Sequence, residues 1–369
     1  MATVANHSKT RQTIAKKGIE PILMISPNTD ASKPLATIDY DNLLQPMGAD
    51  IGNGQLKLVS AMSETRTESY IYELDERSPD GVKGYVEYLK GDRADLIGKQ
   101  WIGGINAYYN GLNSIRRVTD DKQGKPSLGL QLFLSALSEY AHRDKWHIAL
   151  AVSVHDSKTL GSALKRALEG THQVRFRNKE TIVSIKVIAG LEEGTGAIIT
   201  YQKQADITNA ILYDLGNGTL IVSSFNGLKM TDRSYSQNGG VEKLIDQIAT
   251  HDAIRERLLK EGDRHLIRKG IEAQTFTYGT QHPDWNFESV YREELPKWVK
   301  AVLAPTVRPW EDRRDSATAL IAVGGGAQLP GIEPLLNKKG IKVLPDPLWA
   351  NARGLYTLAT RKVAQLEAK

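Results

Sequence analysis

The stretch that decides the fold spans residues 47–60, MGADIGNGQLKLVS, because a second copy of its core follows later in the chain. Residues 50–57, DIGNGQLK, are repeated with changes at residues 214–221, DLGNGTLI. Each copy reads acid, apolar residue, Gly-Asn-Gly, polar residue and apolar residue. Asn-Gly supplies the two positive-φ positions of a type I′ turn between two strands. We therefore predict two β-hairpins, each with a tight Asn-Gly turn.

The acid before each turn indicates more than a hairpin, since the turn itself does not require it. Asp50 and Asp214 each end a predicted strand just before the glycines. If the hairpins face each other across a cleft, their backbone N–H groups hold phosphate oxygens and their carboxylates orient a hydrated divalent cation. A single copy would indicate a plain hairpin, but the repeat favours a site for phosphate and a divalent cation.

Length and composition predict a globular chain with two domains. The chain has 369 residues, 40% of them hydrophobic and 25% charged, which is typical of soluble proteins. No apolar run approaches the roughly 18 residues that span a bilayer, and residues 1–17 lack the apolar core of a secretory signal. The absence of cysteine excludes disulfides and thiolate metal sites. We therefore expect a cytoplasmic protein without a transmembrane segment.

The charge of the chain does not by itself predict a nucleic-acid-binding protein. The net charge is +5, and no recognisable nucleic-acid module is present. Residues 1–45 read as a polar, basic extension that is either a solvated tail or a contact for an anionic partner. A DNA-binding patch stays open as an alternative, and a chain that acts on DNA through an adaptor protein would not need such a module.

Strand and helix patterns alternate in the first half of the chain. Residues 63–80 are polar and predict an excursion loop, and residues 119–125, TDDKQGK, predict a charged loop. Apolar residues over 128–141 predict a largely buried helix. The nearly continuous apolar run 146–154, WHIALAVSV, predicts a central strand.

The second half repeats this alternation, which indicates an α/β fold that arose by internal duplication. After the second hairpin we expect a third strand at 228–231 and an amphipathic helix at 241–249. Residues 319–323 predict a short strand that ends in glycines 324–326, and residues 349–366 predict a closing helix.

Several common sites are excluded by their missing motifs. There is no G-x-x-x-x-G-K-[ST], and the Gly-x-Gly pairs lack the third glycine of a dinucleotide fold. Neither G-x-S-x-G nor H-E-x-x-H occurs. What remains is a series of glycine-rich turns at 52–54, 216–218, 239–240 and 324–326.

In this order the motifs resemble those of the actin-like ATPase superfamily, shared by actin, heat-shock chaperones and sugar kinases, and most of all bacterial plasmid-segregation actins of the ParM/StbA type. The Asp50 and Asp214 hairpins resemble the two phosphate motifs, and residues 323–327, VGGGA, resemble the adenosine motif. Residues 191–197, LEEGTGA, resemble a P-E-G-x-G-A segment, and residues 347–359 resemble a closing A-N-A-R-G helix.

The resemblance implies an actin-like (ribonuclease H-like) duplicated α/β fold with two domains around a nucleotide cleft. Its first domain would comprise residues 46–209 and 345–369, and its second domain residues 210–344. The ligands implied are ATP or GTP together with Mg²⁺.

The resemblance also implies roles for individual residues. Asp50, Asp214 and Glu193 would be catalytic, with Mg²⁺ held by the two aspartates through water and the attacking water oriented by Glu193. Lys57 would neutralise phosphate charge, and Glu192 stands where the pattern has proline. The residues expected at the nucleotide are Gly52, Asn53, Gly54, Lys57, Gly216, Asn217, Gly218, Thr219, Gly240, Lys243, Gly324, Gly325 and Gly326.

Plainer interpretations of several of these residues stay open. Asp214 alternatively just ends a strand, Glu193 is a turn residue and Lys57 a solvated strand residue, and Glu242 and Lys243 form part of an exposed helix face.

The function implied is an actin-like ATPase that polymerises with itself into dynamic filaments. The family's usual use is plasmid segregation, with an adaptor protein that links the filament to DNA. The alternatives are a filament that acts in cell shape or at the cell cortex, a small-molecule kinase of the same fold and a chaperone-like ATPase. The chain shows no clear sugar-binding insertion and no substrate domain beyond the ATPase fold.

Overall fold

The computed structural model describes residues 43–76, 81–111, 114–120, 124–202, 207–237, 239–282 and 284–368. Almost all of the predicted extension over residues 1–45 lies outside these residues, as does part of the predicted charged loop. Within the described residues, no helix is long and apolar enough to cross a membrane.

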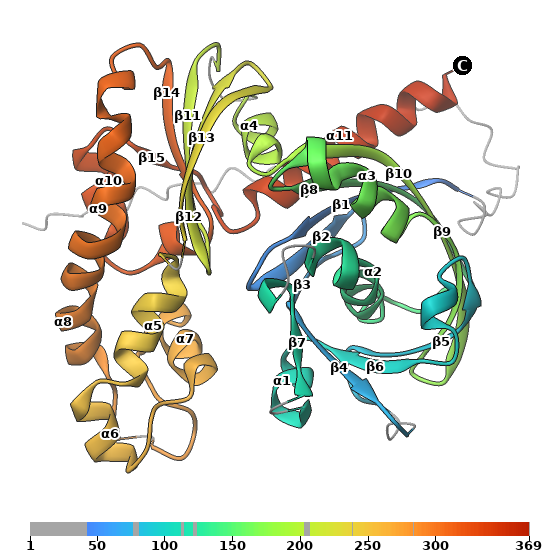
Figure 1. Cartoon of the computed structure of the whole chain (residues 1–369), viewed down its shortest axis with the longest axis horizontal. Helices are drawn as coiled ribbons and strands as arrows, with labels where there is room; N and C mark the ends of the chain where they lie inside the picture. The colour runs from blue at the N-terminus through green and yellow to red at the C-terminus, as the bar shows by residue number, and fades with distance from the viewer. Residues whose placement is uncertain are drawn as a thin grey trace, which may run out of the picture. The chain divides into compact units, whose positions relative to one another are not determined.

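A ten-stranded sheet, here called the first sheet, contains the strands of the first half of the chain (Figure 1). Its strand order is β3-β2-β1-β8-β10-β9-β5-β6-β4-β7. The bounds are β1 (Gln45–Ile51), β2 (Gln55–Ser60), β3 (Glu64–Glu68), β4 (Tyr70–Leu74), β5 (Tyr85–Gly91), β6 (Gln100–Gly103), β7 (Arg116–Arg117), β8 (Lys145–Val154), β9 (Gly170–Phe176) and β10 (Lys179–Glu192).

A five-stranded sheet, here called the second sheet, contains the later strands in the order β13-β12-β11-β14-β15. Its bounds are β11 (Ala210–Leu215), β12 (Thr219–Asn226), β13 (Lys229–Gln237), β14 (Ala319–Val323) and β15 (Lys342–Val343).

Both sheets contain the same five-stranded core, which confirms the predicted duplication of an α/β fold. In the first sheet β3, β2 and β1 pair antiparallel, and β8 and β10 continue the sheet in parallel. In the second sheet β13, β12 and β11 pair antiparallel, and β14 and β15 continue in parallel. Equivalent strand ends therefore carry equivalent residues, and the two hairpins occupy corresponding places.

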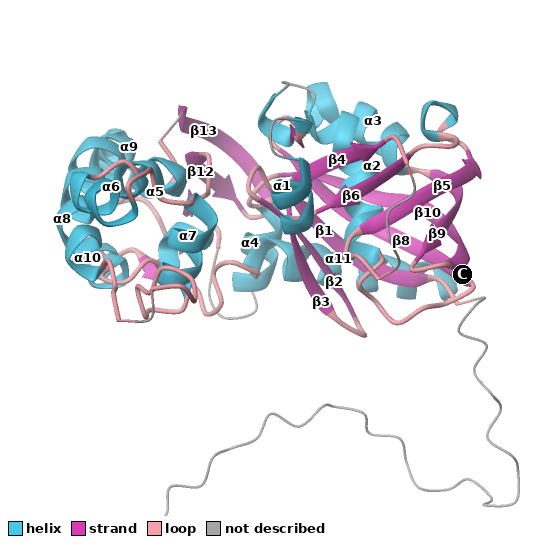
Figure 2. Cartoon of the chain, turned by 90° about the horizontal axis from the view of Figure 1, so that it is seen from below, coloured by secondary structure: helices cyan, strands magenta, loops and turns pink. Residues whose placement is uncertain are grey.

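Helices cover the sheets and are unevenly distributed along the chain. In Figures 1 and 2, α5 to α10 gather on one side of the strands β12 and β13. The bounds are α1 (Ile105–Gly111), α2 (Gly124–Leu137), α3 (Ser157–Leu168), α4 (Thr195–Tyr201), α5 (Val241–Ala249), α6 (Asp252–Leu258), α7 (Arg264–Glu272), α8 (Glu288–Trp298), α9 (Ala304–Val307), α10 (Ile332–Lys338) and α11 (Ala350–Glu367).

The closing helix α11 returns to the first sheet, where it packs against β1, β8 and α4. Glycines allow this approach. A Cβ atom at Gly48 of β1 would lie 2.3 Å from the backbone nitrogen of Tyr356, and one at Gly354 would lie 1.7 Å from the carbonyl oxygen of Gly196. Real Cβ atoms do not approach backbone so closely, so any larger residue would push the helix off the sheet.

The predicted excursion loop at 63–80 is wrong, because the structure places β3 and β4 there. The sequence of β3 is ETRTE, which is too polar to predict a strand, yet β3 pairs antiparallel with β2. Strands near a sheet edge often carry charged side chains. The predicted charged loop is also too long, since α2 already begins at Gly124.

Candidate functional site

The two Gly-Asn-Gly turns are three-residue connections. The backbone nitrogen of Gly52 donates a hydrogen bond of 3.1 Å to the carbonyl oxygen of Gln55. No residue in 52–54 or 216–218 has a left-handed φ, so the predicted type I′ turn is wrong. The glycines are required by close packing instead, since a Cβ atom at Gly52 would lie 2.8 Å from the carbonyl oxygen of Gln55.

The two turns face each other, as the repeat predicted. A Cβ atom at Gly54 would lie 2.7 Å from the Cβ atom of Asn217, and one at Gly218 would lie 3.5 Å from Nδ2 of Asn53. The guanidinium of Arg268, in α7, donates a hydrogen bond of 2.5 Å to Oδ1 of Asn217. The turns therefore meet at one place although their hairpins belong to different sheets.

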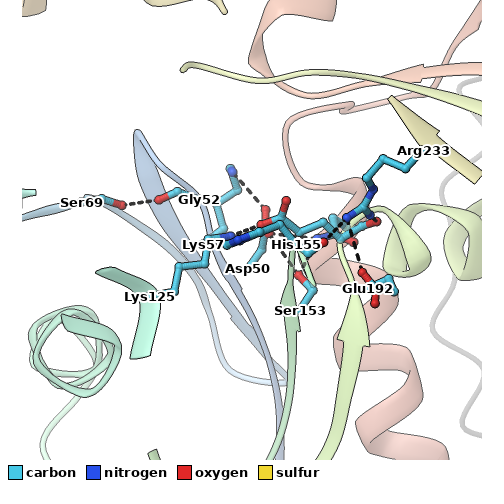
Figure 3. Close-up of polar contacts among 11 residues, drawn as sticks. Asp50, Gly52, Lys57, Ser69, Lys125, Ser153, His155, Glu192 and Arg233 are labelled. Carbon is cyan, nitrogen blue, oxygen red and sulfur yellow. Dashed lines mark hydrogen bonds and ion pairs between the residues drawn. The ribbon is translucent and has the colours of Figure 1, made fainter. Parts of the chain in front are cut away.

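Ser69 fixes the first turn from the residue between β3 and β4 (Figure 3). Its hydroxyl donates a hydrogen bond of 2.6 Å to the carbonyl oxygen of Gly52. Its backbone nitrogen donates a hydrogen bond of 3.0 Å to the carbonyl oxygen of Gly54. The side chain is fully buried. With two carbonyl groups held, the turn is fixed at both ends.

One cavity brings together most of the predicted site residues. Those that line it are Asp50, Gly52, Asn53, Gly54, Lys57, Glu193, Asp214, Gly216, Asn217, Gly218, Thr219, Gly324, Gly325 and Gly326.

Asp50, which lines the cavity, lies in a network of donors (Figure 3). Nζ of Lys57 is 3.2 Å from its Oδ2, and Nδ2 of Asn351 donates a hydrogen bond of 2.9 Å to its Oδ1. Burial raises the pKa of the Asp50 carboxyl, but Lys57, Lys125 and the Asn351 amide outweigh burial and hold that pKa below its usual value. Asp50 is therefore a carboxylate at neutral pH.

Asp214 occupies the equivalent position but lacks the partners of Asp50. Asp50 pairs in register with Lys57, whereas Asp214 pairs with Ile221. Among the described residues, no group donates a hydrogen bond to the Asp214 carboxylate. Burial, together with the nearby charge of Asp50, raises the pKa of Asp214 to about 6. Asp214 is therefore an acceptor with free capacity for a cation or its waters.

Glu193 reaches the same cavity from the segment between β10 and α4. Its carboxylate forms a close ion pair with the ammonium of Lys125. Gly194 follows with a φ of 88°, a left-handed conformation that favours glycine. Glu192 does not line the cavity, because its Oε1 accepts hydrogen bonds of 2.9 Å and 2.6 Å from the nitrogen and hydroxyl of Ser157. Of the two glutamates, the structure places Glu193 in the cavity.

Lys125 is a site residue that the sequence pattern assigned to a loop. It lies in the first turn of α2, and only 5% of its side chain is exposed. Burial lowers the pKa of Lys125 to about 8, against the opposing effect of Asp50 and Asp214. The lysine thus remains largely protonated at neutral pH and faces three carboxylates. A lysine directly before an apolar helix was the only sequence signal for this position.

Part of the cavity lining is apolar. Gly325 and Gly326 begin a short 3-10 helix there, and the side chains of Val241, Ile245 and Ile271 line the wall. Such a wall suits a planar, weakly polar ring.

Gly240 and Lys243 do not line this cavity. Gly240 caps α5, where a Cβ atom would lie 2.0 Å from the carbonyl oxygen of Asn217, so glycine is needed for packing. Lys243 is exposed, while Val241 and Ile245 face the cavity from the same helix. Two charged side chains of α7, Arg268 and Glu272, line the cavity instead.

Comparison with known proteins agrees with this geometry. Residues 48–196, which include the first hairpin and Glu193, match the family model for the N-terminal domain of actin-like proteins. The chain therefore has the fold of actin-like proteins. No curated protein matches the sequence.

Solved structures of ParM proteins and of an archaeal actin homolog share this fold. ParM of Bacillus thuringiensis with ATP is 19% identical, with 88% of this chain and 99% of that chain covered at a TM-score of 0.66. The archaeal actin homolog Ta0583 is 18% identical, with coverage of 86% and 100% and a TM-score of 0.65. Apo ParM of pSK41 is 15% identical, with coverage of 88% and 99% and a TM-score of 0.62. At these identities the likeness concerns the fold.

Proposed function

We propose that this actin-like chain binds and hydrolyses a nucleoside triphosphate, ATP or GTP, in the cavity between its two hairpins. The observation that carries the proposal is the juxtaposition of two glycine turns, each led by an aspartate, around a single cavity that also contains Glu193. The ParM structures of Bacillus thuringiensis with ATP, with AMPPNP and with ADP support a nucleotide as the ligand.

The proposed roles follow from charge and position. The turns at 52–54 and 216–218 present backbone N–H groups to the phosphates, while the ammonium groups of Lys57 and Lys125 supply positive charge. Glu193 orients the water that attacks the terminal phosphate. Phosphoryl transfer depends mainly on positioning and electrostatics, so no covalent nucleophile is required.

The donor set also fits Mg²⁺. Two carboxylates face one cavity, and the one on Asp214 has no hydrogen-bond donor among the described residues. Mg²⁺ prefers oxygen ligands and keeps several waters, so Asp50 and Asp214 would hold it through water. When bound, the ion would neutralise the charge of the phosphates.

We further propose that the chain assembles with itself into filaments. On this proposal, residues 46–209 with 345–369 and residues 210–344 form the two domains of a subunit in the cytoplasm. Its use is plasmid segregation, in which an adaptor protein links the filament to DNA. These steps rest on the ParM-like fold.

Sedimentation and electron microscopy of the protein with ATP, with ADP and without nucleotide test the assembly. We expect filaments with ATP and fewer with ADP. Filaments under none of these conditions would refute polymerisation.

Variants of the cavity test the nucleotide site. We expect Asp214→Ala to abolish Mg-ATP binding or turnover, and Glu193→Ala to slow phosphate release while ATP still binds. Asp284→Asn, which changes an exposed aspartate, is the matched control. Unchanged hydrolysis in Asp214→Ala would show that the site lies elsewhere.

A further inference from the structure

Arg233 of β13 links the second sheet to the strand ends of the first sheet (Figure 3). Its Nε donates a hydrogen bond of 3.2 Å to the hydroxyl of Ser223, in its own sheet. Its two terminal nitrogens reach the other sheet, where they contact the carbonyl oxygen of His155, Oε2 of Glu192 at 3.4 Å and the carbonyl oxygen of Glu193 at 2.8 Å. Only 12% of the side chain is exposed.

These contacts hold the backbone that carries Glu193. The nitrogen of Glu193 donates a hydrogen bond of 3.1 Å to the carbonyl oxygen of Val154, and its carbonyl oxygen accepts from Arg233. The preceding side chain, Glu192, is held by Ser157 as well as by Arg233. The peptide groups on both sides of Glu193 are thus fixed, and the left-handed Gly194 directs the chain into α4.

Arg233 itself does not line the cavity. Its hydrogen bond to the site is the one to the Glu193 carbonyl, while its charge also favours the ionised form of Asp214. The planar guanidinium suits this place because its fork bonds several acceptors at once, which a lysine ammonium cannot do in the same geometry.

We propose that Arg233 is a positioning residue that makes the orientation of Glu193 depend on the contact between the two sheets. The proposal rests on the proposed function, because it explains how the carboxylate of Glu193 is held in position in the same hydrolytic site. Its consequence is that hydrolysis is efficient only while the sheets hold the arrangement in which Arg233 reaches the Glu193 carbonyl.

The test compares single-turnover hydrolysis of Mg-ATP with the dissociation constant of the nucleotide. We expect Arg233→Met to slow hydrolysis by about 10- to 100-fold, since small misplacements of a catalytic group cost this much. Nucleotide affinity should stay within about threefold of wild type, because Arg233 lies outside the cavity lining. Arg233→Lys should recover part of the rate.

The matched control is Arg313→Met. Arg313 pairs with Asp232 and stacks on Trp310, both in the same half of the chain as Arg233. Its removal should leave the rate unchanged. The double variant Arg233→Met with Glu193→Gln should hydrolyse no more slowly than Glu193→Gln alone, since both changes act on one group.

The outcomes separate the two proposals. Wild-type protein without turnover overturns the proposed function. Wild-type turnover with an unchanged rate in Arg233→Met, or with additive losses in the double variant, overturns the positioning role alone. If Arg233→Met does not fold, Arg233→Gln takes its place, and an unchanged rate in that variant has the same meaning.

Discussion

The side-chain amide of Asn351 donates a hydrogen bond of 2.9 Å to Oδ1 of Asp50, and the two residues are 301 positions apart in the chain. The same amide donates one of 3.0 Å to the hydroxyl of Ser153. The closing helix α11 therefore holds the carboxylate of the first hairpin as well as covering the first sheet.

Asn351→Ala should destabilise the protein and weaken Mg-nucleotide binding. The change leaves a buried carboxylate with one donor fewer, and hydrogen bonds to charged groups contribute about 1.5–3 kcal/mol. Urea unfolding measures the loss of stability, and titration with Mg-ATP measures affinity. Asn337→Ala, at an exposed asparagine of α10, should change neither quantity. Equal behaviour of the two variants would contradict a role for the amide.

Nucleotide binding should depend on pH through Asp214, whose pKa burial raises to about 6. A protonated carboxyl is a poor ligand for a hydrated cation, so the affinity for Mg-ATP should fall as the pH drops through about 6. Titrations at several pH values with and without Mg²⁺ measure this dependence. An affinity for Mg-ATP that is constant across this range would contradict it.

Asp214→Asn should stabilise the protein while it removes Mg-nucleotide binding. The pKa of Asp214 in the folded protein, about 6, lies above the ordinary value of 3.8. The stabilisation from the protonated form is therefore lost as the pH rises through about 6, and the charged group destabilises the fold at neutral pH. Removing that charge should raise the free energy of unfolding by about 1–3 kcal/mol above pH 6. A variant less stable than wild type at neutral pH would contradict this expectation.

Breaking the ion pair between Lys125 and Glu193 should be costly. Lys125→Met leaves the Glu193 carboxylate without its buried partner, and such losses amount to about 3–5 kcal/mol. The double variant Lys125→Met with Glu193→Gln should recover much of that stability without recovering hydrolysis. The pair of the exposed Lys165 and the half-buried Glu169 is the control, because Lys165→Met should cost less than about 1 kcal/mol. Chemical unfolding of all four proteins distinguishes these outcomes.

Gly54→Ala should weaken nucleotide binding by forcing the two turns apart. The added Cβ atom would lie 2.7 Å from the Cβ atom of Asn217. Combining the change with Asn217→Gly should restore part of the fit. Gly190→Ala is the matched control, because nothing lies within 4 Å of a Cβ atom there. If both alanine variants bind nucleotide equally, the turns do not need their close approach.

The duplicated fold and the core of the site could be predicted from local sequence. The two D-x-G-N-G stretches place an aspartate at each strand end whatever the rest of the chain does, and the nearly continuous apolar run of β8 favours a central strand. The turn type could not be predicted, because Gly54 is glycine on account of Asn217 in the other hairpin and not of its own φ.

Tertiary structure alone decided which polar groups from outside the hairpins reach the two aspartates. Lys125, Arg233 and Asn351 come from α2, β13 and α11, and although Asn351 lies in the A-N-A-R-G segment, the sequence did not place any of the three at the aspartates. β3 likewise becomes a strand only because β2 offers it hydrogen-bond partners. Periodicity and turn motifs are local properties of a chain, whereas ion pairs and packing at a site depend on which distant segments the folded sheets bring together. The sequence therefore determined the repeated hairpins with their aspartates and Lys57, and only folding brought Lys125, Arg233 and Asn351 to them.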